Sequence, residues 1–319
     1  MYIGVDVGGT NLVAGLVDRE YHILAKAKMK TRGAGEHQAE ALCEDIVTVA
    51  RQAAELGNVP LSEVELVGVG IPGAIDRPEG VVLHTPNAPF QNTPVRMLFQ
   101  RQWNVPVYLG NDANCAMVGE YLAGAAKGYR SAMVVTLGTG VGAGVIVDGK
   151  LFTGCNDTGL EVGHTVIQVG GRPCNCGRRG CWERYSSATG LKMTTREVME
   201  TAPDSLMWDL AGGSLEGVGG RTAFQAAREG DPGGRRVVEQ YLRYLGIGLT
   251  NMVNIFQPEI ICLGGGVSNE ADDLFLEPLR RYVEEERFTR EGRQTEIVKA
   301  KLGNDAGIIG AAFPFLDRQ

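Results

Sequence analysis

Short apolar runs alternate with turns rich in glycine, asparagine and aspartate along most of the chain. These runs predict buried strands at 2–7, 12–17, 23–29, 64–71, 105–109, 133–137, 144–147, 260–263 and 296–300. Apolar side chains three and four positions apart predict helices at 36–56, 95–102, 113–126, 186–200, 221–229, 235–256, 274–286 and 306–315. Strands that alternate with helices in this way predict an α/β fold with helices covering parallel or mixed sheets.

One unit, a strand, a glycine turn and a second strand, occurs twice. With a shift of 130 positions, Val5 falls on Val135, Gly8 on Gly138, Val17 on Val147 and Asp18 on Asp148. Such an internal repeat predicts two related α/β domains with a cleft between them. We expect a small first domain at 1–112, to which 303–319 returns as a C-terminal helix, and a larger second domain at 113–302.

Composition and charge narrow the class of protein. The 319 residues are 44% hydrophobic and 22% charged, with 31 Lys and Arg against 38 Asp and Glu, so the formal charge is −7. This acidic balance does not favour nucleic acid or an anionic membrane as a partner. The start of the chain has no signal-peptide pattern, and its seven cysteines do not look like a disulfide framework. We therefore expect a cytoplasmic protein.

A cluster of metal-binding residue types lies between 162 and 185. Three thiols and one imidazole are the ligand set of a structural zinc site, and they are His164, Cys174, Cys176 and Cys181. Glu161 and Glu183 flank the cluster. We expect zinc to fix this loop, which we call the zinc loop (162–185), so that Glu161, His164 and Glu183 point at one ligand.

Three glycine turns follow predicted strands and are candidates for nucleotide binding. They are Gly8-Gly9-Thr10, Gly138-Thr139-Gly140 and Gly264-Gly265-Gly266. Glycine lets backbone N–H groups approach an anion, and threonine adds a hydroxyl donor. We expect the first two to hold the phosphates and the third to pass under an adenine ring, although each alone could be an ordinary turn. Asp6, at the end of its strand, suits Mg²⁺ held through water.

Asp112 is the candidate catalytic base. It follows a predicted strand in Gly110-Asn111-Asp112, where its carboxylate would face a cleft rather than a core. Phosphoryl transfer to an alcohol needs a group that accepts the hydroxyl proton, and Asn111 could hold the acceptor. An Asn or Asp at this place could also cap the following helix, and both roles are compatible.

Taken together, these motifs resemble the ROK family of bacterial sugar kinases, especially its zinc-containing glucokinases. The resemblance covers essentially the whole chain and runs through DVGGTN (6–11), GVGIPG (68–73), TPN (85–87), NDAN (111–114), LGTGVGAGV (137–145), LEVGH (160–164), CNCGRRGCWE (174–183), LGGGV (263–267) and NDAGIIGAA (304–312). It implies an actin/hexokinase-like (ribonuclease H-like) fold of two domains, and a homodimer. It also implies Asn11 at the nucleotide and sugar contacts from Gly73, Asn87, Asn111, Asp112, Glu161, His164 and Glu183.

The resemblance implies transfer of the ATP γ-phosphoryl group to the 6-hydroxyl of glucose, with Mg²⁺ as cofactor and zinc as scaffold. His164 would bind zinc through one ring nitrogen and a sugar hydroxyl through the other. Alternatives remain: another hexose such as N-acetylmannosamine, N-acetylglucosamine, fructose or allose, and polyphosphate or ADP as donor. The family also contains sugar-responsive repressors with an N-terminal winged helix, which we do not expect here because a strand begins at Tyr2. An actin-like filament protein would have no use for the zinc loop.

Overall fold

The computed structural model describes residues 1–31, 38–85 and 88–314 and confirms a mixed α/β fold of the actin/hexokinase type. The predicted repeat is present in the backbone. Strands β1 (Tyr2–Val7) and β2 (Asn11–Val17) reappear 130 positions later as β9 (Ala132–Leu137) and β10 (Val141–Val147). Because all four boundaries keep this shift, the glycine turn has the same place in both copies.

Two five-stranded sheets share one order of strands. The first sheet runs β3-β2-β1-β4-β8, and β1 pairs antiparallel with β2 but parallel with β4. The second runs β11-β10-β9-β12-β13. The strands not yet bounded are β3 (Ile23–Lys30), β4 (Leu66–Ile71), β8 (Val107–Asn111), β11 (Lys150–Phe152), β12 (Ile260–Gly264) and β13 (Glu296–Lys299).

A third sheet was not predicted. Its strands are β5 (Ala74–Asp76), β6 (Val81–His84) and β7 (Gln91–Thr93), in the order β5-β6-β7. Each has only three or four residues, too few for an alternation of polar and apolar positions to stand out.

The predicted helices are present with different ends, and one four-residue helix at Met207–Leu210 was not predicted. The described helices are α1 (Gln38–Leu56), α2 (Val95–Gln100), α3 (Asp112–Ala123), α4 (Glu183–Ser186), α5 (Ala188–Glu200), α6 (Met207–Leu210), α7 (Thr222–Arg228), α8 (Pro232–Phe256), α9 (Leu276–Glu286) and α10 (Asp305–Ala312). The expected single helix at 186–200 is wrong at its start, because Ser187 is extended and separates α4 from α5. Residues 36–37 and 315 of two predicted helices lie outside the described residues. Over 1–31, 38–85 and 88–314, no helix is long and apolar enough to span a membrane.

Two compact units make up the chain. The first comprises 1–134, 144–160 and 300–319, and the second comprises 135–143 and 161–299. The domain limits expected above, 1–112 with 303–319 and 113–302, stay a prediction.

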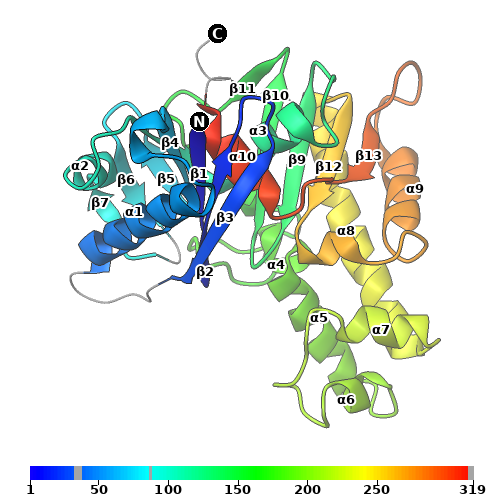
Figure 1. The fold of residues 1–319 in the computed structure, drawn as a ribbon. Helices are drawn as coiled ribbons and strands as arrows, with labels where there is room; N and C mark the ends of the chain where they lie inside the picture. The colour runs from blue at the N-terminus through cyan, green and yellow to red at the C-terminus, as the bar shows by residue number, and fades with distance from the viewer. Residues whose placement is uncertain (32–37, 86–87, 315–319) are drawn as a thin grey trace. The chain divides into compact units, whose positions relative to one another are not determined.

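In the first unit, α10 packs on β1 and α3 with almost no space between the backbones (Figure 1). A Cβ atom on Gly4 would lie 1.8 Å from the carbonyl oxygen of Ile308, and one on Gly310 would lie 1.7 Å from that of Cys115. Such contact is possible only for glycine, so the small residues of the terminal helix fix its position. The opposite face of the sheet is covered by α1, whose buried side chains join the main core.

In the second unit, the long helix α8 packs against α4, α5, α7 and α9. Trp182, which is fully buried, lies so close to α8 that a Cβ atom on Gly248 would be 1.9 Å from its ring. Its indole N–H donates to the carbonyl oxygen of Tyr244. The residue just before Glu183 is therefore anchored on the central helix of this unit.

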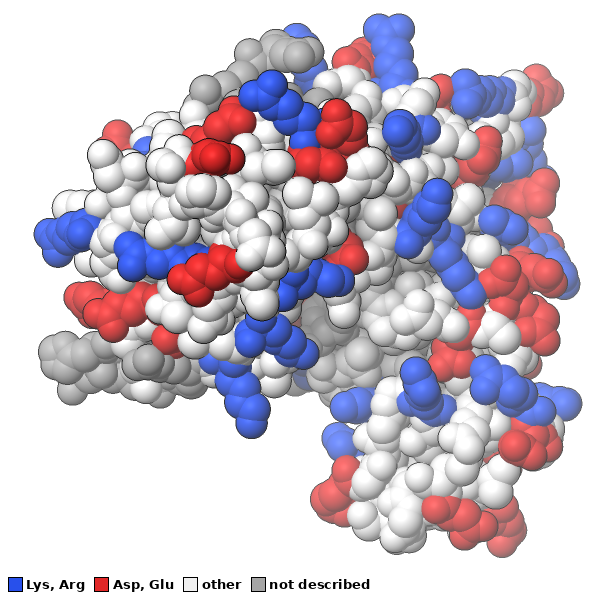
Figure 2. Space-filling model, viewed as in Figure 1, with Lys and Arg blue, Asp and Glu red and all other residues white. Residues whose placement is uncertain are grey.

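Charged side chains of both signs are interspersed over the face shown in Figure 2. Exposed ion pairs also form, such as Lys26 with Asp305 at 2.9 Å and Arg130 with Asp148 at 3.0 Å, both within the first unit. Pairs of this kind contribute about 0–1 kcal/mol each. The fold therefore rests mainly on the buried apolar cores.

Candidate functional site

Two acidic side chains lie close together in the first unit. Asp6 is near the end of β1, and Asp112 is the first residue of α3. Burial raises the pKa of Asp6 to about 6, and the charge of Asp112 adds to the rise. Burial also raises the pKa of Asp112. Two carboxyl groups held this way resist ionisation, and a bound divalent cation would reverse that tendency.

Asn111 joins the start of α3 to Gly73. Its Oδ1 atom accepts hydrogen bonds from the backbone N–H groups of Ala113 and Asn114, at 2.9 and 3.2 Å. Its Nδ2 atom donates to the carbonyl oxygen of Gly73 at 3.3 Å. The side-chain cap of the helix is thus Asn111. One N–H of the Asn111 amide also remains for a ligand.

The first glycine turn is closed by bonds from two directions. The Gly8 N–H donates to the carbonyl oxygen of Asn11 at 3.0 Å. Thr31, which follows β3, donates its hydroxyl to the carbonyl of Gly8 at 2.7 Å and its N–H to that of Thr10 at 3.0 Å. These bonds fix the shape of the turn. Its other backbone N–H groups are candidates to bind an anion.

The four predicted zinc ligands lie together in the second unit. Their ligand atoms are all within 4.8 Å of one another. The Cys176 and Cys181 sulfur atoms are 3.6 Å apart, and Cys174 Sγ is 3.6 Å from His164 Nδ1. Zinc–sulfur bonds of about 2.3 Å and tetrahedral angles require edges of roughly 3.6–3.8 Å. The cluster therefore fits a structural zinc ion.

The protonation state of the cysteine thiols affects the binding of zinc at this site. Burial raises the pKa of Cys174 to about 12 and also raises the pKa of Cys181. All seven cysteines are free thiols rather than disulfides. A zinc ion must therefore displace protons as it binds, which makes its affinity depend on pH. Since Nδ1 of His164 faces Cys174, Nε2 is the ring nitrogen left for another ligand.

Glu183 lies between the zinc ligands and the second glycine turn. Its Oε1 atom is 3.4 Å from Cys174 Sγ and 3.9 Å from His164 Nδ1. On the other side, a Cβ atom on Gly140 would be 2.6 Å from Glu183 Oε2. A side chain at position 140 would therefore push this carboxyl group away from its present place. A candidate sugar residue thus touches a candidate phosphate turn within one unit.

The second glycine turn is held by the start of α5. Ala188 donates its N–H to the carbonyl of Gly138 at 2.8 Å, and Thr189 donates its hydroxyl to the carbonyl of Thr139 at 2.8 Å. Gly265 approaches the same turn, since a Cβ atom there would lie 2.4 Å from the carbonyl oxygen of Leu137. The predicted turns at 138–140 and 264–266 are therefore neighbours. After Gly264–Gly266 the chain forms a short 3₁₀ turn (Gly266–Asn269).

The structure brings together most of the predicted residues that share a unit. Glu161 and His164 lie at the two ends of one 3₁₀ turn, where the His164 N–H donates to the carbonyl of Glu161 at 3.0 Å. Asn87 lies outside the described residues. Sequence reasoning missed Thr31 and Thr189, which hold the glycine turns. Both lie far along the chain from the turns they hold, so no local pattern indicates them.

Comparison with known proteins identifies the family of the chain. The ROK family model matches residues 2–318. The glucokinase of Thermotoga maritima is 37% identical over 97% of this chain and 95% of its own length. The glucokinase of Streptomyces coelicolor is 34% identical over 97% and 96%. A ROK glucokinase from Streptomyces griseus, solved with glucose and AMPPNP, has a TM-score of 0.84 and 34% identity over 98% of this chain and 97% of its own.

Proposed function

Since the chain belongs to the ROK family, we propose that it is a hexose kinase that transfers the γ-phosphoryl group of ATP to the 6-hydroxyl of glucose. The observation that carries this proposal is the place of Glu183. Its carboxyl group lies against the zinc ligands on one side and against Gly140 on the other. A residue that binds sugar hydroxyls at that point would hold the acceptor beside the phosphates.

Asp112 is the proposed base of the reaction. As the bond forms between the sugar O6 and the γ-phosphorus, the hydroxyl proton passes to the Asp112 carboxylate, and the bond from the γ-phosphorus to the bridging oxygen breaks to release ADP. A pKa raised by burial makes Asp112 a better proton acceptor than a solvated aspartate. Asn111, fixed through its bonds to α3 and Gly73, would orient the acceptor hydroxyl.

The remaining roles follow the two kinds of ligand. Sugar contacts are proposed for Gly73, Asn87, Asn111, Glu161, His164 and Glu183. The nucleotide is proposed to lie on Asp6, Gly8, Gly9, Thr10, Asn11, Gly138, Thr139, Gly140, Gly264, Gly265 and Gly266. Glycine turns let backbone N–H groups approach phosphates, and the open space at Gly266 suits a flat ring.

Two metal ions complete the proposal. Asp6 would hold Mg²⁺ with its water shell, and that ion would neutralise charge on the transferring phosphate. His164, Cys174, Cys176 and Cys181 fit zinc, which would brace the loop that carries Glu183. The chain itself supplies the base, the acceptor amide and the phosphate turns.

The decisive experiment measures ADP release by the purified protein with Mg-ATP and a panel of hexoses. The panel is glucose, fructose, mannose, allose, N-acetylmannosamine and N-acetylglucosamine, each compared by kcat/KM. We expect glucose to give the highest value. Preference for an acetylated sugar would keep the mechanism and change the substrate, whereas tight sugar binding with no turnover would point to a regulator.

The Asp112→Asn variant, measured in the same assay, tests the role of Asp112 as the base. Loss of the proton acceptor should lower kcat by about 10²–10⁴-fold, because general-base catalysis contributes that much. Binding of ATP, measured by calorimetry, should persist. Wild-type turnover in this variant would rule out Asp112 as the base.

We also propose an oligomeric state and a cellular location. The family resemblance supports a homodimer, which light scattering of the purified protein tests directly. Use of ATP and seven free thiols support a location in the cytoplasm, where ATP is abundant and thiols stay reduced.

A further inference from the structure

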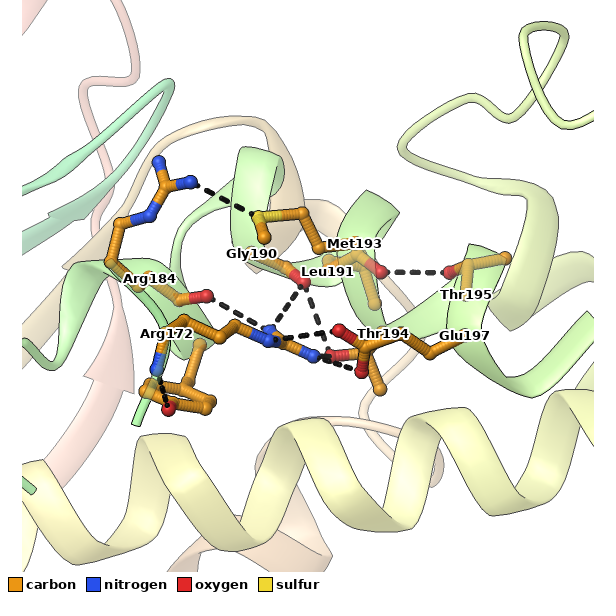
Figure 3. A network of polar contacts seen from close by, with 9 residues as sticks. Arg172, Arg184, Gly190, Leu191, Met193, Thr194, Thr195 and Glu197 are labelled. Carbon is orange, nitrogen blue, oxygen red and sulfur yellow. Dashed lines mark hydrogen bonds and ion pairs between the residues drawn. The ribbon is translucent and has the colours of Figure 1, made fainter. Parts of the chain in front are cut away.

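Arg172 lies two residues before the zinc ligand Cys174, and its guanidinium group is surrounded by acceptors from α4 and α5 (Figure 3). One nitrogen, Nη1, donates to the carbonyl oxygens of Arg184 at 2.9 Å and Gly190 at 3.4 Å. The others reach Thr194 Oγ1 at 3.0 Å and Glu197 Oε1 at 3.1 Å. A planar guanidinium with five N–H donors can serve such divergent acceptors, whereas an ammonium group cannot.

The backbone at Gly171 and Arg172 packs closely against the Tyr185 side chain. The Arg172 N–H donates to the Tyr185 hydroxyl at 2.7 Å, and the guanidinium carbon lies 4.7 Å from the centre of the Tyr185 ring. A Cβ atom on Gly171 would lie 2.1 Å from the same hydroxyl. The middle of the zinc loop is thus tied to its last residue, two positions beyond Glu183.

The residues on both sides of Glu183 in the chain are therefore held in place. Before it, Cys181 belongs to the zinc cluster and Trp182 is buried on α8. After it, Arg184 and Tyr185 are bonded to Arg172. A helix of four residues such as α4 has too few internal hydrogen bonds to hold its own position, so these external bonds must do so.

The same side chain also fixes α5, whose start holds the second glycine turn. Arg172 binds the carbonyl of Gly190 and the hydroxyl of Thr194 on α5. Ala188 and Thr189, just upstream, bind the carbonyls of Gly138 and Thr139. One guanidinium thus links the zinc loop, the helix that begins with Glu183, and the helix that supports the turn.

We propose that Arg172 is a positioning residue for the sugar-binding side of the reaction, keeping Glu183 in place between the zinc ligands and the glycine turn. This inference rests on the proposed function, because Glu183 is taken there to bind sugar. Arg172 itself touches neither ligand. Its loss would loosen α4 and α5 from the middle of the zinc loop, while α5 keeps its own bonds to the glycine turn at 138–140.

Steady-state kinetics of Arg172→Met test the proposal, because methionine keeps an unbranched stem about as long as the arginine side chain up to Nε and removes every side-chain donor. At a temperature well below the melting transition, the KM for glucose should rise about tenfold, and the KM for ATP should change less than about threefold. A displacement of about 1 Å in a binding site is enough for such an effect. Arg172→Lys should restore only part of the loss.

Two matched controls separate this role from surface charge. Arg179 is an exposed arginine of the same loop with one long bond, to the carbonyl of Gly170 at 3.4 Å, so Arg179→Met should leave both KM values unchanged. Glu200 is an exposed glutamate of the same helix α5 that is not bonded to Arg172, so Glu200→Gln should leave both KM values unchanged. Equal changes in R179M and R172M would overturn the proposal, as would a folded R172M enzyme with the wild-type KM for glucose.

A second measurement does not depend on turnover. Release of zinc to a chromogenic chelator should be several-fold faster in R172M than in the wild type, since the middle of the zinc loop has lost its side-chain bonds to α4 and α5. A wild type that phosphorylates no hexose would refute the proposed function alone, whereas an unchanged rate of zinc release would refute the role of Arg172. If R172M does not fold, Tyr185→Phe removes only the bond to the Arg172 N–H, and a smaller rise in the glucose KM is expected. An unchanged KM in Y185F would then count against the proposal.

Discussion

Asp6 holds a carboxyl group in surroundings that oppose its charge. Its pKa is about 6 in the folded state and 3.8 in the unfolded chain, so the folded state binds more protons between these values. Stability should therefore fall as pH rises from about 4 to about 6 and stay lower above that range. Asp6→Asn removes this charge and should raise the free energy of unfolding at pH 8 by about 2–3 kcal/mol, while Mg-dependent turnover is lost.

Chemical denaturation without Mg²⁺, at pH 4 and at pH 8, measures this effect. The gain in D6N should be large at pH 8 and nearly absent at pH 4. Asp18 offers a control of opposite sign, because hydrogen bonds from Glu20 and His22 outweigh its slight burial and lower its pKa. Asp18→Asn should lower stability at pH 8. A D6N protein no more stable than the wild type at pH 8 would contradict the argument.

At the scale of elements, Glu120 joins α3 to the segment that returns to the first unit before α10. It is fully buried, and its two carboxyl oxygens accept from the N–H groups of Ala125 at 2.7 Å, Lys301 at 3.1 Å and Leu302 at 2.7 Å. Glu120→Ala would leave three N–H groups without these acceptors. We expect it to lower the free energy of unfolding by about 3 kcal/mol or more.

Urea denaturation followed by circular dichroism measures this loss. Glu55→Ala is the matched control, an exposed glutamate on α1, and it should change stability by less than about 0.5 kcal/mol. Similar values for E120A and E55A would show that α10 is held without Glu120, by its close backbone contacts alone.

Most strands and long helices could be predicted, because their apolar patterns are strong. The 130-residue repeat was visible for the same reason, since β1 and β9 are both short apolar strands before a glycine turn. The break at Ser187 was not visible. It arises because α4 must end where Ser187 caps α5, with its side chain accepting from the Gly190 N–H. The strands β5–β7 are too short for an alternation of polar and apolar residues to be detected.

For the whole molecule, the site could be predicted only where its chemistry is local in sequence. The zinc ligands follow one another within 18 residues, from His164 to Cys181, and the structure brings them together. The supports of the site are not local. Thr31 holds a turn more than twenty residues upstream, and Thr189 holds one fifty residues upstream. Tertiary packing alone brings such pairs together, so a single sequence does not reveal them.

Removal of zinc should affect the two units unequally, because all four ligands belong to the second. We expect a chelator, or Cys176→Ser, to abolish amide protection in the zinc loop and to weaken it in α4, α5 and the 138–140 turn, which are linked by hydrogen bonds. Protection in β1, β4 and α10 should stay, since their bonds lie within the first unit. Hydrogen exchange followed by mass spectrometry measures each segment.

Cys155→Ser provides the control, because Cys155 is an exposed thiol of the first unit outside the cluster. It should keep one zinc per chain and the wild-type exchange pattern. In Cys176→Ser the KM for glucose should rise at least tenfold, since Glu183 loses the loop that places it between Cys174 and Gly140. Uniform loss of protection across both units would mean that zinc supports the whole fold, and an unchanged glucose KM in a zinc-free enzyme would mean that α8 and Arg172 suffice to hold Glu183.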